Sequence, residues 1–307
     1  MPELPDVTVY CERLAAFVQG RVLQDVTLRS PFVLRTVSPA LSDLRGLTIQ
    51  GVRRLGKRIV LSFEGDLFLV IHLMIAGRLR WKTRTRTVPS RGGLAGFHFE
   101  HGMLLFTEAS KKKRASLHVV KGQEAMLAFD RGGIEPLEVD GSAFAQALRE
   151  RRHTLKRALT DPRIFSGIGN AYSDEILFRA RLSPLQLTTN LSDDEVARLF
   201  DAVQGVLEVW VERLRNQVGT GFPDKVTAFH PEMCVHGRFK EPCTVCGAPI
   251  QRIAYAERET NYCASCQTGG RLLRDRAMSM LMKRDWPKTL DELEAGRLER
   301  TERLKRS

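Results

Sequence analysis

The chain has 307 residues, which is enough for about two domains with cores of their own. Its composition, 43% hydrophobic and 27% charged, is typical of a globular protein, and no apolar run reaches the length of about 18 residues that would cross a membrane. The net charge of +12 favours a polyanionic partner, nucleic acid before an anionic membrane, although charge that only aids solubility would give the same balance.

The first residues, Met1-Pro2-Glu3-Leu4-Pro5-Asp6-Val7, put a proline at the N-terminus once the initiator methionine is removed. A free secondary amine at that position is a nucleophile, because α-amino groups titrate near pKa ~8 and form Schiff bases with carbonyl-like carbons. Glu3 would then be its acid–base partner. The alternative is that Pro2 only stiffens the start of the chain.

Residues 7–18 carry apolar side chains at helical spacing, and Gly20 follows as a stop signal. From there to about residue 120 the chain alternates between short apolar runs and turns, with candidate strands at 58–63, 67–71, 97–99, 103–106 and 116–120. This half predicts an antiparallel β-sandwich or barrel behind a leading helix. Lys57 precedes one strand within the basic run 53–58, where it is either a phosphate clamp or part of a solvated turn.

Residues 130–141 hold three glycines and a proline and predict a linker. Beyond it the pattern becomes helical, with one segment around 143–159 and a long helix opened by the capping box Ser192–Glu195. Between them lies Gly167-Ile-Gly-Asn170. Glycines before a helix can expose backbone N–H groups to a phosphate, and Asn170 can add a donor, although a tight helix–helix turn is the alternative. No strand precedes this run, so a nucleotide cofactor is not expected.

Four of the six cysteines follow the spacing C-x2-C-x16-C-x2-C. Two such knuckles place four thiolates around one zinc ion with no open position, which predicts a single structural Zn²⁺, with a disulfide pair or an iron–sulfur cluster as alternatives. The predicted ligands are Cys243, Cys246, Cys263 and Cys266. The intervening residues 251–262 predict a β-hairpin, which would hold Arg258 in a fixed direction. Basic amphipathic segments follow, one of them opened by a second capping box, Thr289–Glu292.

Together these motifs resemble the formamidopyrimidine-DNA glycosylase/endonuclease VIII family of base-excision repair enzymes. PELPDV is similar to the catalytic N-terminus of the family, LGKRI to its lysine-bearing strand, and HLMIAGRLRW to its H-L-G-M-S-G-R segment. TLKRALTD and GIGNAYSDEILFRARLSP resemble its helix–two-turn–helix DNA clamp, and VHGR, the four cysteines and ERETNYC resemble its zinc finger. The resemblance spans residues 2 to about 266.

The resemblance implies a bifunctional DNA glycosylase that flips a damaged base out of the duplex and also cleaves the strand. Pro2 would attack C1′ of the sugar, Glu3 would protonate the opened sugar oxygen, and β- or β,δ-elimination would follow. Lys57, Asn170 and Arg258 match family residues that grip phosphates, and Arg258 is also tied to the second elimination. Lys156 matches a family lysine near the base pocket.

The fold class that follows is α+β and multidomain. The expected parts are a catalytic β-sandwich at 1–130, a linker at 131–141, a helix–two-turn–helix domain at 142–235, a zinc finger at 236–268 and a basic helical extension at 269–307. The expected partner is double-stranded damaged DNA, bound by a monomer in the cytoplasm or nucleoid, with no membrane involved.

Several positions depart from the family pattern. The family's formamidopyrimidine branch fills the space left by the flipped base with a methionine, an arginine and a phenylalanine. Here the methionine position holds Ile75, and the loop 108–115 reads EASKKKRA without a phenylalanine. Asp6 replaces the more usual glutamate, a histidine near residues 91–96 has no counterpart, and the tail after Gln267 is longer. 8-Oxoguanine is therefore not assigned as the substrate.

Two other functions remain compatible with these motifs. One is a non-catalytic damaged-DNA-binding protein that keeps the clamp and the finger, as the altered loop suggests. The other is an RNA- or ribosome-associated zinc protein, because helix–two-turn–helix units also occur in such proteins. The intact N-terminal motif favours the glycosylase over both.

Overall fold

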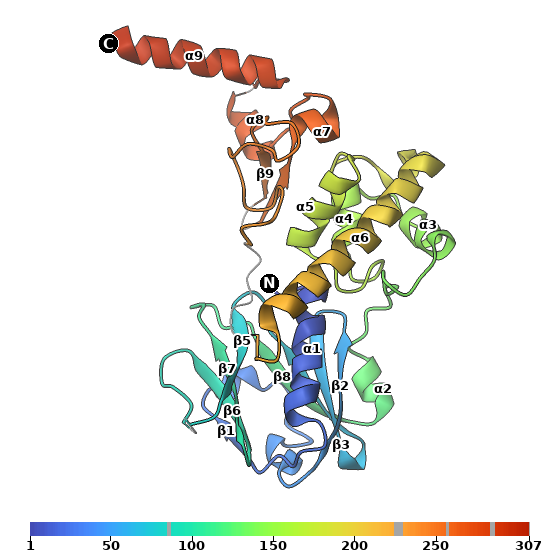
Figure 1. Ribbon diagram of the computed structural model, residues 1–307, viewed down its shortest axis with the longest axis vertical. Helices are drawn as coiled ribbons and strands as arrows, with labels where there is room; N and C mark the ends of the chain where they lie inside the picture. The colour runs from blue at the N-terminus through green and yellow to red at the C-terminus, as the bar shows by residue number, and fades with distance from the viewer. Residues whose placement is uncertain (85–86, 224–229, 256–257, 283–285, 307) are drawn as a thin grey trace. The chain divides into compact units, whose positions relative to one another are not determined.

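The computed structural model describes residues 1–84, 87–223, 230–255, 258–282 and 286–306 (Figure 1). The chain forms two compact units. The first consists of Met1–Glu135, Phe165–Gly167 and Leu207–Ala228, and the second of Pro136–Ile164, Ile168–Val206 and Phe229–Ser307. The five domain boundaries expected from the sequence stay predictions.

The first unit contains two four-stranded antiparallel sheets, as the sequence predicts. One sheet has the order β2-β3-β4-β8, with bounds Ile49–Leu55, Arg58–Phe63, Leu67–His72 and Ser116–Lys121. The other has the order β1-β6-β7-β5, with bounds Asp25–Leu28, Gly93–Phe99, Gly102–Glu108 and Gly77–Lys82. Short 3-10 turns at Pro31–Val33, Leu41–Leu44 and Glu64–Asp66 and the helix α2, Gln123–Leu127, complete this part.

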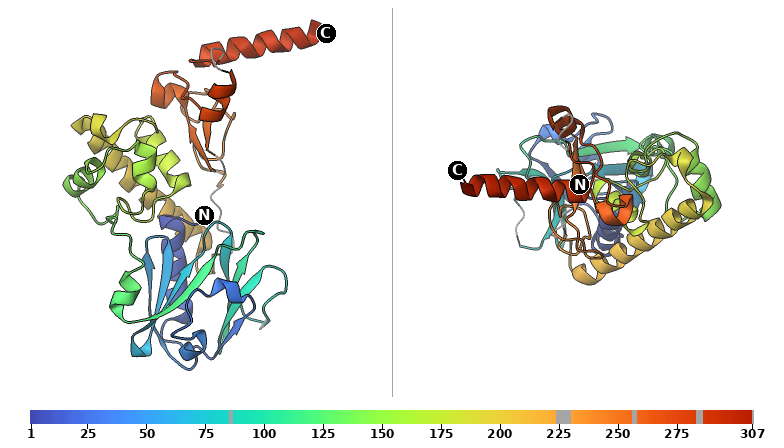
Figure 2. Two further views of the ribbon diagram at one scale, coloured as in Figure 1. Left: turned by 180° about the vertical axis from the view of Figure 1, so that it is seen from behind. Right: turned by 90° about the horizontal axis from the view of Figure 1, so that it is seen from above.

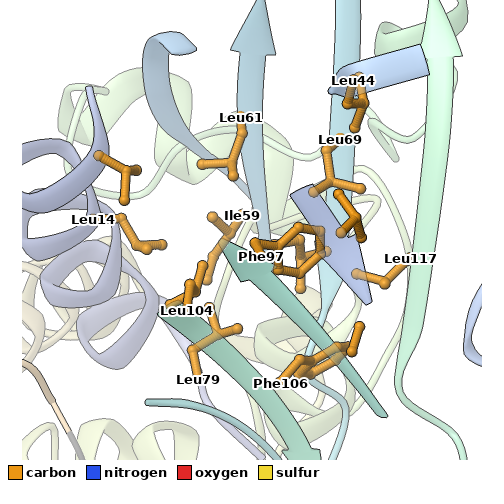
Figure 3. Packing of buried hydrophobic residues seen from close by; sticks show 14 of the residues in the cluster. Leu14, Leu44, Ile59, Leu61, Leu69, Leu79, Phe97, Leu104, Phe106 and Leu117 are labelled. Carbon is orange, nitrogen blue, oxygen red and sulfur yellow. The ribbon is translucent and has the colours of Figure 1, made fainter. Parts of the chain in front are cut away.

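The helix α1, Leu4–Val18, packs against β2 and β3. Its apolar face and the inner faces of both sheets share one core. Figure 3 shows the labelled side chains converging there, among them Leu14 of α1, Ile59 of β3, Leu69 of β4 and Phe97 of β6. Full burial of a leucine or phenylalanine stabilises a fold by roughly 1.5–3 kcal/mol, so this core anchors the start of the chain firmly to the sandwich.

The second unit begins with α3, Gly141–Arg149, and α4, Leu155–Thr160. The single helical segment expected around 143–159 is therefore wrong, because the chain is interrupted at 150–154. The backbone of His153 is paired with Thr188 instead of a helix neighbour: Thr188 N–H donates to His153 O at 2.9 Å, and His153 N–H donates to Thr188 Oγ1 at 3.2 Å. Tertiary pairing here overrides helical spacing.

Two further helices follow, α5, Asn170–Arg179, and α6, Asp193–Val218, with a 3-10 turn at Thr188–Asn190 between them. The predicted capping box at the start of α6 is confirmed. Glu195 N–H donates to Ser192 Oγ at 3.2 Å, and Ser192 N–H donates to the Glu195 carboxylate at 3.0 Å. Together these bonds satisfy two N–H groups at the start of the helix.

The end of the chain contains the antiparallel ribbon of β9, Gln251–Tyr255, and β10, Arg258–Tyr262, so the predicted hairpin is confirmed. The helices α7, Ala264–Thr268, α8, Arg276–Met282, and α9, Leu290–Arg306, follow it (Figure 2). Within the described part of the chain, no helix combines the length and the apolar character needed to span a bilayer.

Candidate active site

Pro2 and Glu3 are buried directly before the first turn of α1. The helix starts here for local reasons. Pro5 lies in the first turn, where its missing N–H costs nothing, and Asp6 Oδ2 accepts the backbone N–H of Glu3 at 2.8 Å. Leu4 N–H donates to Gly167 O at 2.9 Å. These bonds fix the backbone of the first residues in place.

The backbone of Gly167 lies close to the start of α1. Its φ of +80° is disfavoured for residues with a side chain, and an added Cβ would lie 2.8 Å from Leu4 Cβ. Gly167 belongs to the glycine run that the sequence singled out. A glycine at position 167 therefore allows the backbone to pack closely against the N-terminal residues of the first unit.

The N-terminal end of α1 gathers opposite charges. Burial lowers the pKa of the Met1 α-ammonium, and the cations Arg78 and Lys57 lower it further, while Glu3 and Asp6 oppose them. Burial also raises the pKa of Asp6 to about 7. An amine with a lowered pKa has a larger neutral fraction, which is the nucleophilic form. This electrostatic setting suits an amine nucleophile.

Lys57 lies in the tight turn between β2 and β3, after Gly56 with a φ of +58°. The turn is held by Arg54, which donates to Gly56 O at 3.1 Å and forms an ion pair with Glu135. Glu135 in turn accepts a hydrogen bond from Ser166 Oγ at 2.6 Å. Since Ser166 precedes Gly167, one network connects the Lys57 turn with the segment that contacts the start of α1.

His72, at the end of β4, is a residue that the sequence reasoning missed. Burial lowers its pKa to about 4, and Arg58 and Lys57 add to the effect, so the imidazole is neutral near pH 7. Nδ1 accepts the Met74 N–H at 3.1 Å, which assigns the ring proton to Nε2. A neutral donor beside Lys57 can therefore contact an anion. The signal was present in the HLMIAGR run that carries the family resemblance.

Two segments that depart from the family pattern, the turn with Ile75 and the loop 108–115, both have exposed side chains in the first unit. Ile75 lies between β4 and β5 and is 57% exposed, unusual for an isoleucine. The guanidinium of Arg78 donates to Ile75 O at 3.2 Å, which connects this turn to the N-terminal charges. The loop after β7 is held by the buried Glu108 carboxylate, which accepts from Arg114 N–H at 3.0 Å, and the loop's Lys112 is exposed.

Lys156 and Asn170 lie together in the second unit. The Lys156 ammonium donates to Asn170 O at 2.7 Å and to Asp174 Oδ1 at 2.5 Å. The Asp174 side chain is fully buried, and only 13% of the Lys156 side chain is exposed. Removing either member of such a buried pair leaves an uncompensated charge, so the pair fixes the geometry of this corner.

Asn170 is also bound to the ribbon. Its Nδ2 donates to Glu259 O at 2.8 Å. An amide nitrogen carries two N–H donors, so this bond and a contact to a phosphate are compatible. Arg258, the residue before Glu259, begins β10 and its backbone pairs with Tyr255. The side chain of Arg258 lies outside the described residues.

The neighbouring acids Asp174 and Glu175 in α5 are further residues that the sequence reasoning missed. The Glu175 carboxylate accepts three consecutive backbone N–H groups, those of residues 234, 235 and 236, at 2.8–2.9 Å. Asp174 Oδ2 contacts His236 Nδ1 at 2.7 Å and Asn261 N at 3.2 Å. Two adjacent acids directly before the apolar run Ile176–Phe178 were the available signal. They attach the finger to α5.

The four predicted zinc ligands come together. The Sγ atoms of Cys243, Cys246, Cys263 and Cys266 all lie within 4.8 Å of one another. The sulfurs of Cys246 and Cys263 are 3.4 Å apart and those of Cys243 and Cys266 are 3.9 Å apart, well beyond the disulfide length of about 2.05 Å. All four cysteines are free thiols, which rules out the disulfide alternative. Four thiolates at these separations suit a tetrahedral structural zinc ion with no open position.

The predicted residues thus fall into two groups. Pro2, Glu3 and Lys57 lie in the first unit and Lys156, Asn170 and the backbone of Arg258 in the second.

Three family descriptions match the chain in succession. The formamidopyrimidine-DNA glycosylase N-terminal domain matches residues 1–126, the helix–two-turn–helix domain of the same enzymes residues 133–220, and a zinc finger found in these glycosylases and in an aminoacyl-tRNA synthetase residues 240–269. The zinc-finger match agrees with the cysteine geometry, so the finger is a structural zinc site.

Similar proteins include the formamidopyrimidine-DNA glycosylases of Heliobacterium modesticaldum, 35% identical over 87% of this chain and 100% of the relative, and of Thermus thermophilus, 34% identical over 88% and 100%. A solved Lactococcus lactis relative bound to DNA with an abasic site has a TM-score of 0.77 at 26% identity, covering 87% of this chain and 99% of that one. The chain therefore belongs to the formamidopyrimidine-DNA glycosylase family of base-excision repair enzymes.

Proposed function

We propose that this DNA glycosylase is bifunctional, so that it excises a damaged base from double-stranded DNA and then cleaves the strand as an abasic-site lyase. One observation carries the proposal. Pro2 and Glu3 are buried at the start of α1, where burial lowers the pKa of the neighbouring Met1 α-ammonium in spite of the carboxylates of Glu3 and Asp6. A relative of this chain has been solved with abasic-site DNA, which is the substrate of the lyase step.

In the first step the Pro2 amine, freed by removal of Met1, attacks C1′ of the flipped nucleotide. The C1′–N bond breaks and the base leaves with the bonding electrons and a proton. Glu3 donates a proton to the ring oxygen as the sugar opens, which gives an iminium ion between Pro2 and C1′. The iminium withdraws electrons from C2′ and makes its hydrogen acidic.

Loss of that proton expels the 3′-phosphate and cleaves the C3′–O bond, which is β-elimination. A second proton loss expels the 5′-phosphate, which is δ-elimination, and water then hydrolyses the iminium to restore Pro2. Lys57 and the neutral His72 face the anionic backbone in this scheme, since the cation and the Nε2 donor lie near each other. Asn170 and Arg258 supply further phosphate contacts from the second unit, and Lys156, which matches a family lysine near the base pocket, donates to the Asn170 carbonyl oxygen.

Borohydride trapping tests the proposal. The enzyme with a free Pro2 is mixed with duplex DNA that contains one abasic site, and the reductant converts the iminium to a stable amine. We expect a covalent adduct that maps to the N-terminal peptide by mass spectrometry. The matched pair of controls carries the same short tag at either terminus. The N-terminal tag turns the Pro2 amine into an amide and should abolish the adduct, whereas the C-terminal tag should leave it intact.

An adduct formed at the normal rate by the N-terminally tagged protein would rule out Pro2 as the nucleophile. Tight, salt-sensitive binding to the same duplex without any adduct would instead favour the non-catalytic damaged-DNA-binding protein. A preference for RNA over abasic-site DNA would favour the third alternative.

We also propose that the protein acts as a monomer in the compartment that holds the chromosome, because one chain carries the nucleophile, the acid and the phosphate contacts. Light scattering of the protein on a short duplex tests this, with one chain per lesion expected. A stable dimer on a single lesion would contradict it.

A further inference from the structure

The C-terminal extension, defined here as residues 270–306, lies beyond the three family matches, which end at residue 269. It nevertheless packs closely on the finger. Its two segments pair with each other: Leu272 N–H donates to Lys288 O at 2.8 Å, and Leu290 N–H donates to Gly270 O at 3.1 Å. The first residue of α9, Leu290, therefore lies next to Gly270, the first residue of the extension.

The extension and the ribbon share a small apolar core. Leu272 and Leu290 of the extension are buried with Ile253 of β9 and Tyr262 of β10. Ala264 of α7 completes the buried set, and Leu293 at the start of α9 packs against it. Since these side chains cover one another, removing the extension would expose the ribbon's own apolar residues to water.

Two polar contacts fix the register of this packing. The Asp275 carboxylate is only 4% exposed and accepts Ala254 N–H of β9 at 2.7 Å. The Tyr262 hydroxyl of β10 accepts Leu273 N–H at 2.8 Å. A buried acceptor whose donor is removed costs more than the bond itself contributes, so both contacts specify where the extension lies.

The position of these contacts along the ribbon is informative. Ala254 pairs with Glu259 in the antiparallel register, next to the Arg258–Tyr255 pair. The Ala254 N–H is bound by Asp275, and the Glu259 carbonyl is bound by Asn170. The Ala254–Glu259 pair is thus bound at Ala254 of β9 by the extension and at Glu259 of β10 by α5.

Zinc acts at the other end of the ribbon. Cys263 follows the last residue of β10, Tyr262, which pairs with the first residue of β9, Gln251. An isolated two-stranded ribbon is only marginally stable in water, so an anchor at one end leaves the opposite end free to fray. The extension supplies support near Arg258 on the β9 side, through Asp275, and Asn170 supplies it on the β10 side.

We propose that residues 270–282 and 286–293 form a built-in brace that holds the β9 side of the ribbon at its Arg258 end, opposite the Asn170–Glu259 bond, while zinc holds the Cys263 end. The brace positions the ribbon and takes no part in chemistry. Its link to DNA contact rests on the proposed role of Arg258, but the brace itself is measurable without DNA.

Hydrogen exchange of the full-length zinc-loaded protein tests the brace. Leu290→Ala opens the shared core and Asp275→Ala removes the acceptor for Ala254. Each is expected to speed exchange of the described ribbon amides by about tenfold or more, because each removes a buried contact that opposes local opening of the ribbon. The matched control is Leu298→Ala in α9, because Leu298 is 67% exposed and should leave exchange unchanged.

Zinc transfer to a chromogenic chelator is the second readout. We expect faster release from Leu290→Ala and Asp275→Ala, and the unaltered rate from Leu298→Ala. Unchanged ribbon exchange in both brace variants would overturn the proposal. So would equal acceleration in the ribbon and in β3 and β4 of the first unit, because that pattern reports global destabilisation. Borohydride trapping by the unaltered protein tests the proposed lyase activity separately, so the lyase proposal and the brace proposal can fail independently.

Discussion

The side chain of Asn170 binds the backbone of Glu259, with Nδ2 and the carbonyl oxygen 2.8 Å apart. This bond joins the first residue of α5 to the ribbon residue that follows Arg258. The Lys156 ammonium donates to the backbone oxygen of Asn170, so three of the residues expected to contact DNA are connected through a short stretch of backbone. Disturbing one of them should therefore disturb the others.

Asn170→Ala removes this bond and an expected phosphate donor together. We expect binding to abasic-site duplex to weaken about tenfold or more, because a hydrogen bond to a charged group contributes roughly 1.5–3 kcal/mol. Fluorescence anisotropy with a labelled duplex measures the change. Asn190→Ala, at an exposed position of the same unit, is the control and should bind normally. Equal affinities for Asn170→Ala and the unaltered protein would remove Asn170 from the DNA contact.

Glu3→Gln keeps the shape of the side chain and removes its acid function. Base excision should slow by roughly 10²- to 10⁴-fold, the usual contribution of a general acid, while the affinity for abasic-site DNA stays within about twofold. Single-turnover excision and anisotropy measure the two quantities. Glu12→Gln on the same helix loses only the surface ion pair with Arg215 and should excise normally. Normal excision by Glu3→Gln would assign the acid to another group.

The parts that the sequence predicted are those in which spacing alone specifies the chemistry. The cysteine pattern predicts the zinc cluster because two C-x2-C knuckles leave little choice of ligand geometry. Ser192 and Glu195 predict the start of α6 because the hydrogen bonds of a capping box join residues only three positions apart. The strand β3 was predicted with its bounds, since it is an apolar run between two turns.

The parts that the sequence did not predict depend on contacts between distant residues. β6 begins at Gly93, four residues before the expected strand, because pairing with β7 and full burial override the poor strand propensity of its glycines. The break at 150–154 depends on Thr188, and the role of Glu175 depends on a loop 59–61 residues away. No local pattern reports such partners.

Ile75→Ala tests the exposed turn between β4 and β5. A flipped base leaves a gap in the stack, and apolar side chains inserted at such steps offset the few kcal/mol lost in unstacking. Ile75 lies beside Arg78, which acts on the N-terminal amine, so it is the apolar side chain we expect in the gap. Excision of a paired lesion should fall about tenfold, whereas trapping on single-stranded abasic DNA should change little. Val37→Ala, at a position 93% exposed, is the control.

His72 makes a pH-dependent contribution to stability. Burial lowers its pKa from 6.5 to about 4 in the folded protein. Between these values the unfolded chain binds a proton that the folded chain does not, so stability is full above pH ~6.5 and falls as the pH drops toward ~4. The loss is at most about 1.4 kcal/mol per pH unit. His72→Asn retains an acceptor for Met74 N–H but does not titrate. Urea unfolding should show the unaltered protein losing stability relative to this variant between pH 6.5 and 5, and parallel curves would show that His72 titrates normally in the fold.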